Sequence, residues 1–321
     1  SFIISIGLTF SCLGLYISYN STIFLFFILF GLRFFGQGAM SHAGETTMAR
    51  YFGKNRGKAI SVSTFGGMIG VMILPIIVVN LLYMVGWQEV WLISSFSILI
   101  FFIPIIFFTL KNQKIRHLNF TRSLHDKNIQ KKLRTRDVAT NKKFFIYLPI
   151  SVATPFISTG LTFHQIFIIG QKGWTLQMLS QGFIFLGFFS IIGAIFGGPI
   201  IDKYNTTKVV IFTLIPLFFA ILTLIFFESN FSMFLYMSLL GLNLGISIPF
   251  IGSLWAELFD LESLGTVKAL LHACSVFFSA LSPLVFGYMI DFGLGIYSLS
   301  LLSLFIIIVS TFLTFFYIKT E

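Results

Sequence analysis

Charged residues are scarce in this sequence of 321 residues, at 10% of the chain, whereas 56% of the residues are hydrophobic. A soluble globular domain carries about 25% charged residues. So few charges cannot cover a water-facing surface of ordinary composition. The composition therefore excludes a soluble globular protein and predicts that most of the chain lies in lipid.

Cysteine is also scarce, because the chain has only Cys12 and Cys274, and both lie inside apolar stretches. This usage indicates neither a disulfide framework nor a metal site. The sequence also lacks a glycine-rich phosphate-binding loop and any soluble segment that would hold a nucleotide. We therefore expect no cofactor, no bound metal and no enzymatic activity.

Long apolar blocks dominate what the sequence does contain. Each runs for about 20 residues, the length of helix that crosses about 30 Å of hydrocarbon, and none has the strict alternation of barrel strands. The blocks predict an all-α membrane protein with ten transmembrane helices. Their approximate limits are 2–19, 23–47, 58–85, 88–110, 144–169, 178–200, 207–227, 231–255, 265–290 and 293–317.

The basic residues predict the orientation of these helices. The longest loop, residues 111–143, holds 11 of the 21 lysines and arginines, and basic loops stay in the cytoplasm. Alternating sides from this loop places 19 of the 21 basic residues in the cytoplasm, together with the C-terminus. Lys172 lies outside, and Arg33 lies within a span. The net charge of +10 thus reflects membrane topology and contact with lipid headgroups, not nucleic-acid binding.

A weak internal repeat predicts the domain organisation. The segment ARYFGKNRGKA (Ala49–Ala59) shares its Ala, Phe, Gly and Lys-Ala positions with AELFDLESLGTVKA (Ala256–Ala269). Parallel repeats of six spans are a known transporter plan, so we expect twelve spans in all, the first two preceding Ser1. The predicted parts are an incomplete N-terminal bundle, a basic cytoplasmic linker and a C-terminal six-helix bundle, at residues 1–110, 111–143 and 144–321.

Four segments carry recognisable motifs. LRFFGQGAM has an intramembrane Arg–Gln–Gly pattern, and GGPIIDKYNTTK has Gly, three residues, Asp and a basic residue. ARYFGKNRGKA precedes a Gly-rich helix, and LSPLVFGYMIDFG ends the ninth span. Together they resemble the major facilitator superfamily over essentially the whole chain, most closely its bacterial monocarboxylate-transporter-like and oxalate/formate-type branches. There are two departures: Gln37 and Gly38 come one position later than usual, and Asn205 and Thr206 replace Gly and Arg.

The resemblance implies two six-helix bundles that give alternating access to a site near the midplane. We expect a monomeric symporter of a small organic anion, coupled to protons, in the bacterial inner membrane. One alternative is an efflux antiporter for amphipathic compounds, which a Phe-rich interior would suit, although the third span lacks the Gly-Pro pattern of such antiporters. Another is a membrane-embedded enzyme, for which only Glu257, Asp260 and Glu262 form an acidic group, or a sensor that does not transport.

Arg33 is the strongest candidate for contact with a substrate. It lies near the middle of its span, where an arginine costs about 2.5–3.5 kcal/mol on insertion scales. A guanidinium can bind a carboxylate through two hydrogen bonds, so Arg33 can serve as the counter-charge of an anion. Gln37 lies on the same helical face. The structural alternative is a static contact between Arg33 and backbone carbonyls.

Polar stripes on three further spans extend this prediction. The fifth span carries a polar stripe at helical spacing, with His164 to one side of it, and Pro149 and Pro155 weaken the helix. The stripe consists of Ser151, Thr154, Ser158, Thr162 and Gln165. By resemblance it lines the cavity. The alternative is hydroxyl groups that bond to their own helix. The eighth span carries Asn243 and Ser247 on one face, which would line the cavity or join two helices. The ninth span carries a stripe that would line the cavity or the seam between the halves, and its His272 is the titratable member. The stripe consists of Lys268, His272, Ser275, Ser279 and Ser282.

The loop motif between the sixth and seventh spans predicts a gate. Its residues are Gly198, which allows close helix approach, Asp202, which can cap a neighbouring helix, and Lys203. In this interpretation they hold one conformation at the cytoplasmic face. The alternative is an ordinary turn with charges at the lipid headgroups.

Overall fold

The computed structural model describes residues 2–18, 21–40, 43–44, 56–111, 135–259 and 264–320. Helices and short connecting turns make up these residues, and no strand occurs among them. The chain divides into two compact units. Unit 1 comprises Ser1–Gly70 and Ile77–Ile129, and unit 2 comprises Val71–Ile76 and Gln130–Glu321.

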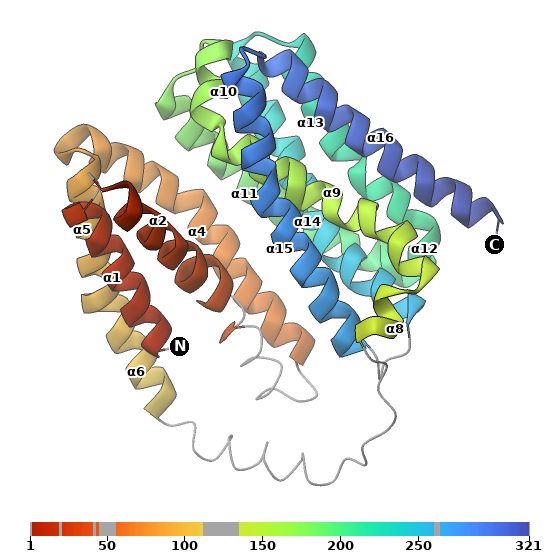
Figure 1. Cartoon of the computed structure of the whole chain (residues 1–321), viewed down its shortest axis with the longest axis horizontal. Helices are drawn as coiled ribbons and strands as arrows, with labels where there is room; N and C mark the ends of the chain where they lie inside the picture. Colours follow the sequence, from red (N-terminus) through yellow and green to blue (C-terminus); the bar gives the residue numbers. More distant parts are fainter. Residues whose placement is uncertain are drawn as a thin grey trace. The chain divides into compact units, whose positions relative to one another are not determined.

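Unit 1 is built around α1, which packs against α2, η1 and α5 (Figure 1, red to yellow). Small residues let these helices approach closely: a Cβ atom at Gly31 would lie 2.5 Å from the Ser11 hydroxyl oxygen. The helices of this unit are α1 (Phe2–Ser18), α2 (Thr22–Gly31), η1 (Leu32–Met40), most of α4 (Arg56–Val85), α5 (Trp87–Ser97), η3 (Ile98–Phe102) and α6 (Ile103–Lys111).

Unit 2 has α14 at its centre, packed against α11 and α13, while α9 packs against α15 and α16 (Figure 1, green to blue). The short helix α8 lies against α9 and α15 through Val138, which is fully buried. The helices of this unit are α8 (Thr135–Ala139), α9 (Lys142–Phe163), α10 (Gln165–Lys172), α11 (Leu176–Lys203), α12 (Thr206–Val209), η4 (Val210–Leu214), α13 (Ile215–Phe226), α14 (Asn230–Leu258), α15 (Leu264–Asp291) and α16 (Ile296–Thr320).

The contact between α11 and α14 brings the two backbones together. A Cβ atom at Gly241 would lie 2.1 Å from the Leu186 carbonyl oxygen, and one at Gly245 would lie 2.0 Å from the Ser190 carbonyl oxygen. Only glycine fits at such distances. In lipid there is no hydrophobic driving force between helices. Small residues instead let the backbones approach closely, and the resulting van der Waals contacts stabilise the pair.

The predicted spans agree well with the observed helices. Within the described part of the chain, nine helical segments are long and apolar enough to cross a membrane, and Phe2–Ile17 is a shorter apolar helix. The all-helical membrane fold is therefore confirmed. The structure adds breaks within spans: the fifth is interrupted at His164, and the seventh begins as the short helix α12 followed by the 3₁₀ turn η4. Residues 112–134 of the predicted linker lie outside the described residues.

Candidate functional site

Arg33 lies where the second span changes from α-helical turns to the wider π-helical turns of η1. A π-helical turn bonds residue i to i+5, so it takes up one residue more than an α-helical turn, and such turns are frequent at functional sites. The widened stretch is the segment in which Gln37 and Gly38 come one position late. The π-helical turns accommodate this extra residue, so the helix continues without a break.

Arg33 is the one charged residue in the sequence of its span. The segment Thr22–Met40 holds no other Asp, Glu, Lys or Arg, and the Arg33 side chain is half-buried. The side chain of Gln37 lies outside the described residues. An arginine in such an apolar helix needs a polar environment, because its transfer to hydrocarbon costs several kcal/mol.

The helix break at His164 separates α9 from α10 and fixes the histidine ring. Its Nδ1 lies 2.9 Å from the Gly160 carbonyl oxygen, and the ring stacks on Phe286 with centroids 6.3 Å apart. A Cβ at Gly287 would lie 3.4 Å from Nε2, so this nitrogen faces the α15 backbone. His164 is therefore held at the contact of α9 with α15.

The polar stripes predicted on the fifth and eighth spans face one another in unit 2. Trp255 donates its indole N–H to the Ser151 hydroxyl, at 3.1 Å, and the hydroxyl oxygens of Thr154 and Ser247 lie 3.3 Å apart. Because α9 and α14 are antiparallel, these pairs are successive rungs of one polar seam. The sequence predicted each face separately, and the structure brings them together.

The same seam contains buried polar atoms that lack hydrogen bonds to the residues described. Both amide atoms of Gln165, the Tyr236 hydroxyl and the Asn243 Oδ1 have no such partner. Gln165 is the polar neighbour of the Tyr236 hydroxyl, but the geometry does not satisfy a hydrogen bond. The other amide atom of Asn243, Nδ2, donates to the Thr213 carbonyl oxygen at 2.8 Å. Unsatisfied polar atoms in a buried seam are costly, at about 1–3 kcal/mol each.

Not every predicted site residue joins the seam. Ser158 is buried within the α9 stripe, whereas Thr162, one turn further on, is exposed. His272 is also exposed, while Ser279 and Ser282 on the same α15 stripe are buried. Ser282 lies directly over Gly160 of α9. The α15 stripe thus runs from an exposed histidine into a close contact with α9.

The opposite end of α10 is tied to the turn between α13 and α14. The Lys172 ammonium donates to the Phe227 carbonyl oxygen at 3.1 Å. Partial burial lowers the pKa of Lys172 below its ordinary value, and the nearby Glu228 carboxylate opposes this shift. Because α10 is short, this bond helps to fix the position of Gln165 at its other end.

The predicted gating loop is held by a residue that the sequence motif did not include. The Glu257 carboxylate, at the end of α14, accepts hydrogen bonds from the backbone N–H groups of Thr206 (3.2 Å) and Thr207 (3.3 Å), and from the Thr206 hydroxyl. A carboxylate at the start of a helix such as α12 is favoured by the free N–H groups there. Two threonines after the capping Asn205 could have indicated this helix start, but not which acid would serve it.

The three motif residues of that loop are placed as follows. Gly198 is half-buried in α11, and no atom of the described residues lies within 4 Å of a Cβ built on it. The Lys203 ammonium lies over the ring of Tyr204, 5.3 Å from its centroid. Asp202 belongs to the last turn of α11, and its side chain lies outside the described residues.

Comparison with known proteins decides the family. The family model of the Major Facilitator Superfamily matches residues 1–216 and 166–321, which together span the whole chain. The chain belongs to this superfamily. No curated protein sequence gave a match. Among solved structures, it resembles a bacterial homologue of the human lysosomal transporter Spinster, in an inward-facing and occupied conformation. The TM-score is 0.63 at 14% identity, over 100% of this chain and 83% of that one.

Membership of the major facilitator superfamily makes the chain a multi-pass membrane protein and a secondary transporter rather than an enzyme. The acidic group that an enzyme would need does not stand free: the Glu257 carboxylate is engaged by α12, and Asp260 and Glu262 lie outside the described residues. Within the described residues, no three His, Cys, Asp or Glu side chains gather as a metal site would require.

Proposed function

We propose that this transporter is a proton-coupled symporter of a small organic anion that works by alternating access. It would act as a monomer in the bacterial inner membrane, with its C-terminus in the cytoplasm, and belong near the monocarboxylate-transporter-like and oxalate/formate-type branches. The observation that carries the proposal is a single arginine, Arg33, within an otherwise uncharged span.

Arg33 supports an anionic substrate because of its chemistry and its position. A guanidinium presents a fork of N–H donors that matches a carboxylate and stays charged at any physiological pH. A substrate carboxylate would offset part of the cost of keeping that charge within the membrane. The π-helical turns around it favour a site that can change shape, because such turns depart from regular helix packing.

The polar seam of unit 2 supports recognition of polar groups on a small solute. Gln165 and Tyr236 are buried, and their polar atoms have no hydrogen-bond partner among the described residues. Hydroxyl, carbonyl or carboxylate groups of a small solute would satisfy them. A site that must hydrogen-bond its ligand rejects analogues that lack the matching group, so these residues would set specificity.

Proton coupling needs a group that titrates near neutral pH, and histidine is the ordinary choice. His164 has one ring nitrogen at the Gly160 carbonyl and is the first candidate for the proton carrier. Its neighbours from α15 are Phe286 and Gly287. His272 is exposed on α15 and is the second candidate for the proton carrier.

Uptake into proteoliposomes tests the proposal. The purified protein is reconstituted and offered a panel of labelled anions, namely formate, oxalate, lactate and pyruvate, with the outside more acidic than the lumen. We expect accumulation of at least one of them that a protonophore abolishes, while empty liposomes show none. Uptake that persists with the protonophore would contradict proton coupling, and the absence of uptake for every anion would contradict the assigned substrate class.

A further inference from the structure

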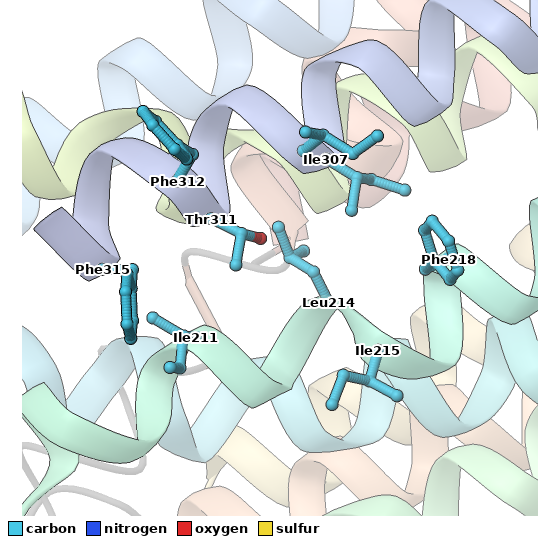
Figure 2. Close-up of a pocket in the computed structure, with 9 residues that line it drawn as sticks. Ile211, Leu214, Ile215, Phe218, Ile307, Thr311, Phe312 and Phe315 are labelled. Carbon is cyan, nitrogen blue, oxygen red and sulfur yellow. The ribbon is translucent and has the colours of Figure 1, made fainter.

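An apolar groove runs along one side of unit 2, between α16 and the helix formed by η4 and α13. Its cavity volume is about 360 Å³. Figure 2 shows side chains from the two helices facing one another across it, with the Thr311 hydroxyl as the one oxygen drawn. The lining residues are Ile211, Leu214, Ile215, Phe218, Ile307, Ile308, Thr311, Phe312 and Phe315. Both helices are long and apolar enough to cross a membrane, so in a bilayer the groove would face hydrocarbon chains.

Both walls of the groove continue into a lysine at the same membrane surface. On α16, Thr311, Phe315 and Lys319 follow one another at intervals of four residues, which keeps them on one helical face. On the other wall, Lys208 of α12 comes three residues before Ile211. Leu214 follows Ile211 at the three-residue period of the 3₁₀ turn η4. The two spans are antiparallel neighbours, and Lys208 lies near the start of one and Lys319 at the end of the other.

The two lysines are available for a ligand. Both side chains are exposed. Among residues 135–259 and 264–320, neither ammonium group has a hydrogen-bond or ion-pair partner. Lysine side chains of this kind lay their apolar stems along a hydrophobic surface and place the charge at the headgroups.

A second apolar groove of about 350 Å³, between α9, α15 and α16, makes a useful contrast. It includes Phe145 and Pro149 near the start of α9. Two lysines lie at that end. Lys142 lies over the ring of Tyr317, at 6.0 Å from its centroid, and Lys143 also has an interaction with a neighbour. Of these two grooves, the one between α13 and α16 has two lysines without a partner among the described residues of unit 2.

We infer that the groove between α13 and α16 binds an anionic phospholipid, with an acyl chain along the apolar walls and the phosphate between Lys208 and Lys319. A basic residue near a membrane surface attracts anionic lipid with about 1 kcal/mol, which is about a fivefold change in affinity per lysine. The pair therefore favours an anionic over a zwitterionic lipid by about 30-fold. In the proposed orientation this lipid belongs to the cytoplasmic leaflet.

Native mass spectrometry of the purified chain, titrated with phosphatidylglycerol or phosphatidylcholine, tests the inference. Wild-type protein should retain phosphatidylglycerol about 30-fold more strongly, and the double variant Lys208→Gln with Lys319→Gln should lose this preference. Lys268→Gln, an exposed lysine elsewhere in unit 2, removes the same charge away from the groove and should keep it. Thr311→Phe fills the groove and should weaken retention of phosphatidylglycerol while both lysines remain.

Three results would overturn the inference. The first is unchanged preference for phosphatidylglycerol in the double variant. The second is competition by inorganic phosphate as effective as that by the lipid, together with no effect of Thr311→Phe, since this would indicate a headgroup site without the acyl chain. The third is a dimer in the mass spectrum that Thr311→Phe dissociates, because a second copy of the chain would then occupy the groove.

Discussion

The two units use similarly apolar helices in different ways. In unit 1, 6% of an apolar 18-residue stretch within Thr22–Met40 is buried, whereas in unit 2 the figure for such a stretch within Lys142–Phe163 is 61%. The continuous cluster of buried apolar side chains, which includes Trp255, Tyr236 and Phe286, consists of unit 2 residues. Unit 1 instead contains the intramembrane arginine and two stretches of π-helical turns.

The packed core and the intramembrane charge therefore lie in different units of the transporter. Unit 2 packs helix backbones against one another and surrounds a polar seam with a close-packed core, so the seam residues are held in defined places. Unit 1 contributes a charge on a helix with widened turns. Regions with few buried apolar contacts open at lower free-energy cost than a packed core. We therefore expect substitutions of packing residues to affect stability in unit 2 far more than in unit 1.

Alanine at two glycines gives the largest expected contrast. In unit 2, Gly245→Ala places a Cβ atom 2.0 Å from the Ser190 carbonyl oxygen, so α11 and α14 must separate. We expect a loss of stability on the order of 3 kcal/mol, measured as a lower midpoint of thermal unfolding in detergent.

The contrasting variant is Gly67→Ala, at an exposed position of α4 in unit 1. No atom of the described residues lies within 4 Å of a Cβ at this position, and alanine is about 1 kcal/mol better than glycine inside a helix. The midpoint should stay the same or rise. Equal losses in the two variants would show that the close approach of α11 and α14 is not what makes alanine costly at Gly245.

Hydropathy was sufficient to predict the helices, because membrane spans must be long and apolar. The contacts could not be predicted in this way. The stripe with Thr154 and the face with Ser247 were each visible as helical spacing, but their pairing depends on how α9 crosses α14. Glu257 was not expected at the loop, since its partners lie 50 and 51 residues away in the chain. The break at His164 follows no proline directly, and the π-helical turns of η1 showed only as a motif one residue too long.

Gln165→Leu tests whether the polar seam is there for function. If its amide serves only the fold, removing two unpartnered buried polar atoms should raise stability by about 1–3 kcal/mol and leave transport unchanged. We expect the rise in the unfolding midpoint together with a loss of substrate affinity, seen as a higher KM for uptake. Thr162→Val, an exposed residue on the same stripe, serves as the control. A stabilised variant with unaltered KM would rule out substrate contact by Gln165.

A smaller difference in stability is expected between two acidic residues that interact with the first turn of a helix, one in each unit. Glu257→Gln in unit 2 removes the charge that accepts the N–H groups of Thr206 and Thr207, and we expect a loss of about 1 kcal/mol. Glu89, exposed in the first turn of α5 in unit 1, is the counterpart, and Glu89→Gln should cost less than about 0.5 kcal/mol. Thermal unfolding of both variants at low and high salt checks the difference, and a larger loss for Glu89→Gln would reverse the comparison.

Uptake of the transported anion by Arg33 variants tests the central claim, that unit 1 supplies the counter-charge of the substrate. The measurement is the initial rate of uptake into proteoliposomes as a function of anion concentration, with equal amounts of folded wild-type protein, Arg33→Ala and Arg33→Lys. Loss of the guanidinium should lower kcat/KM at least about 10-fold for Arg33→Ala, and Arg33→Lys should recover part of it because the charge remains but the fork of donors does not. Wild-type uptake by Arg33→Ala would contradict the account.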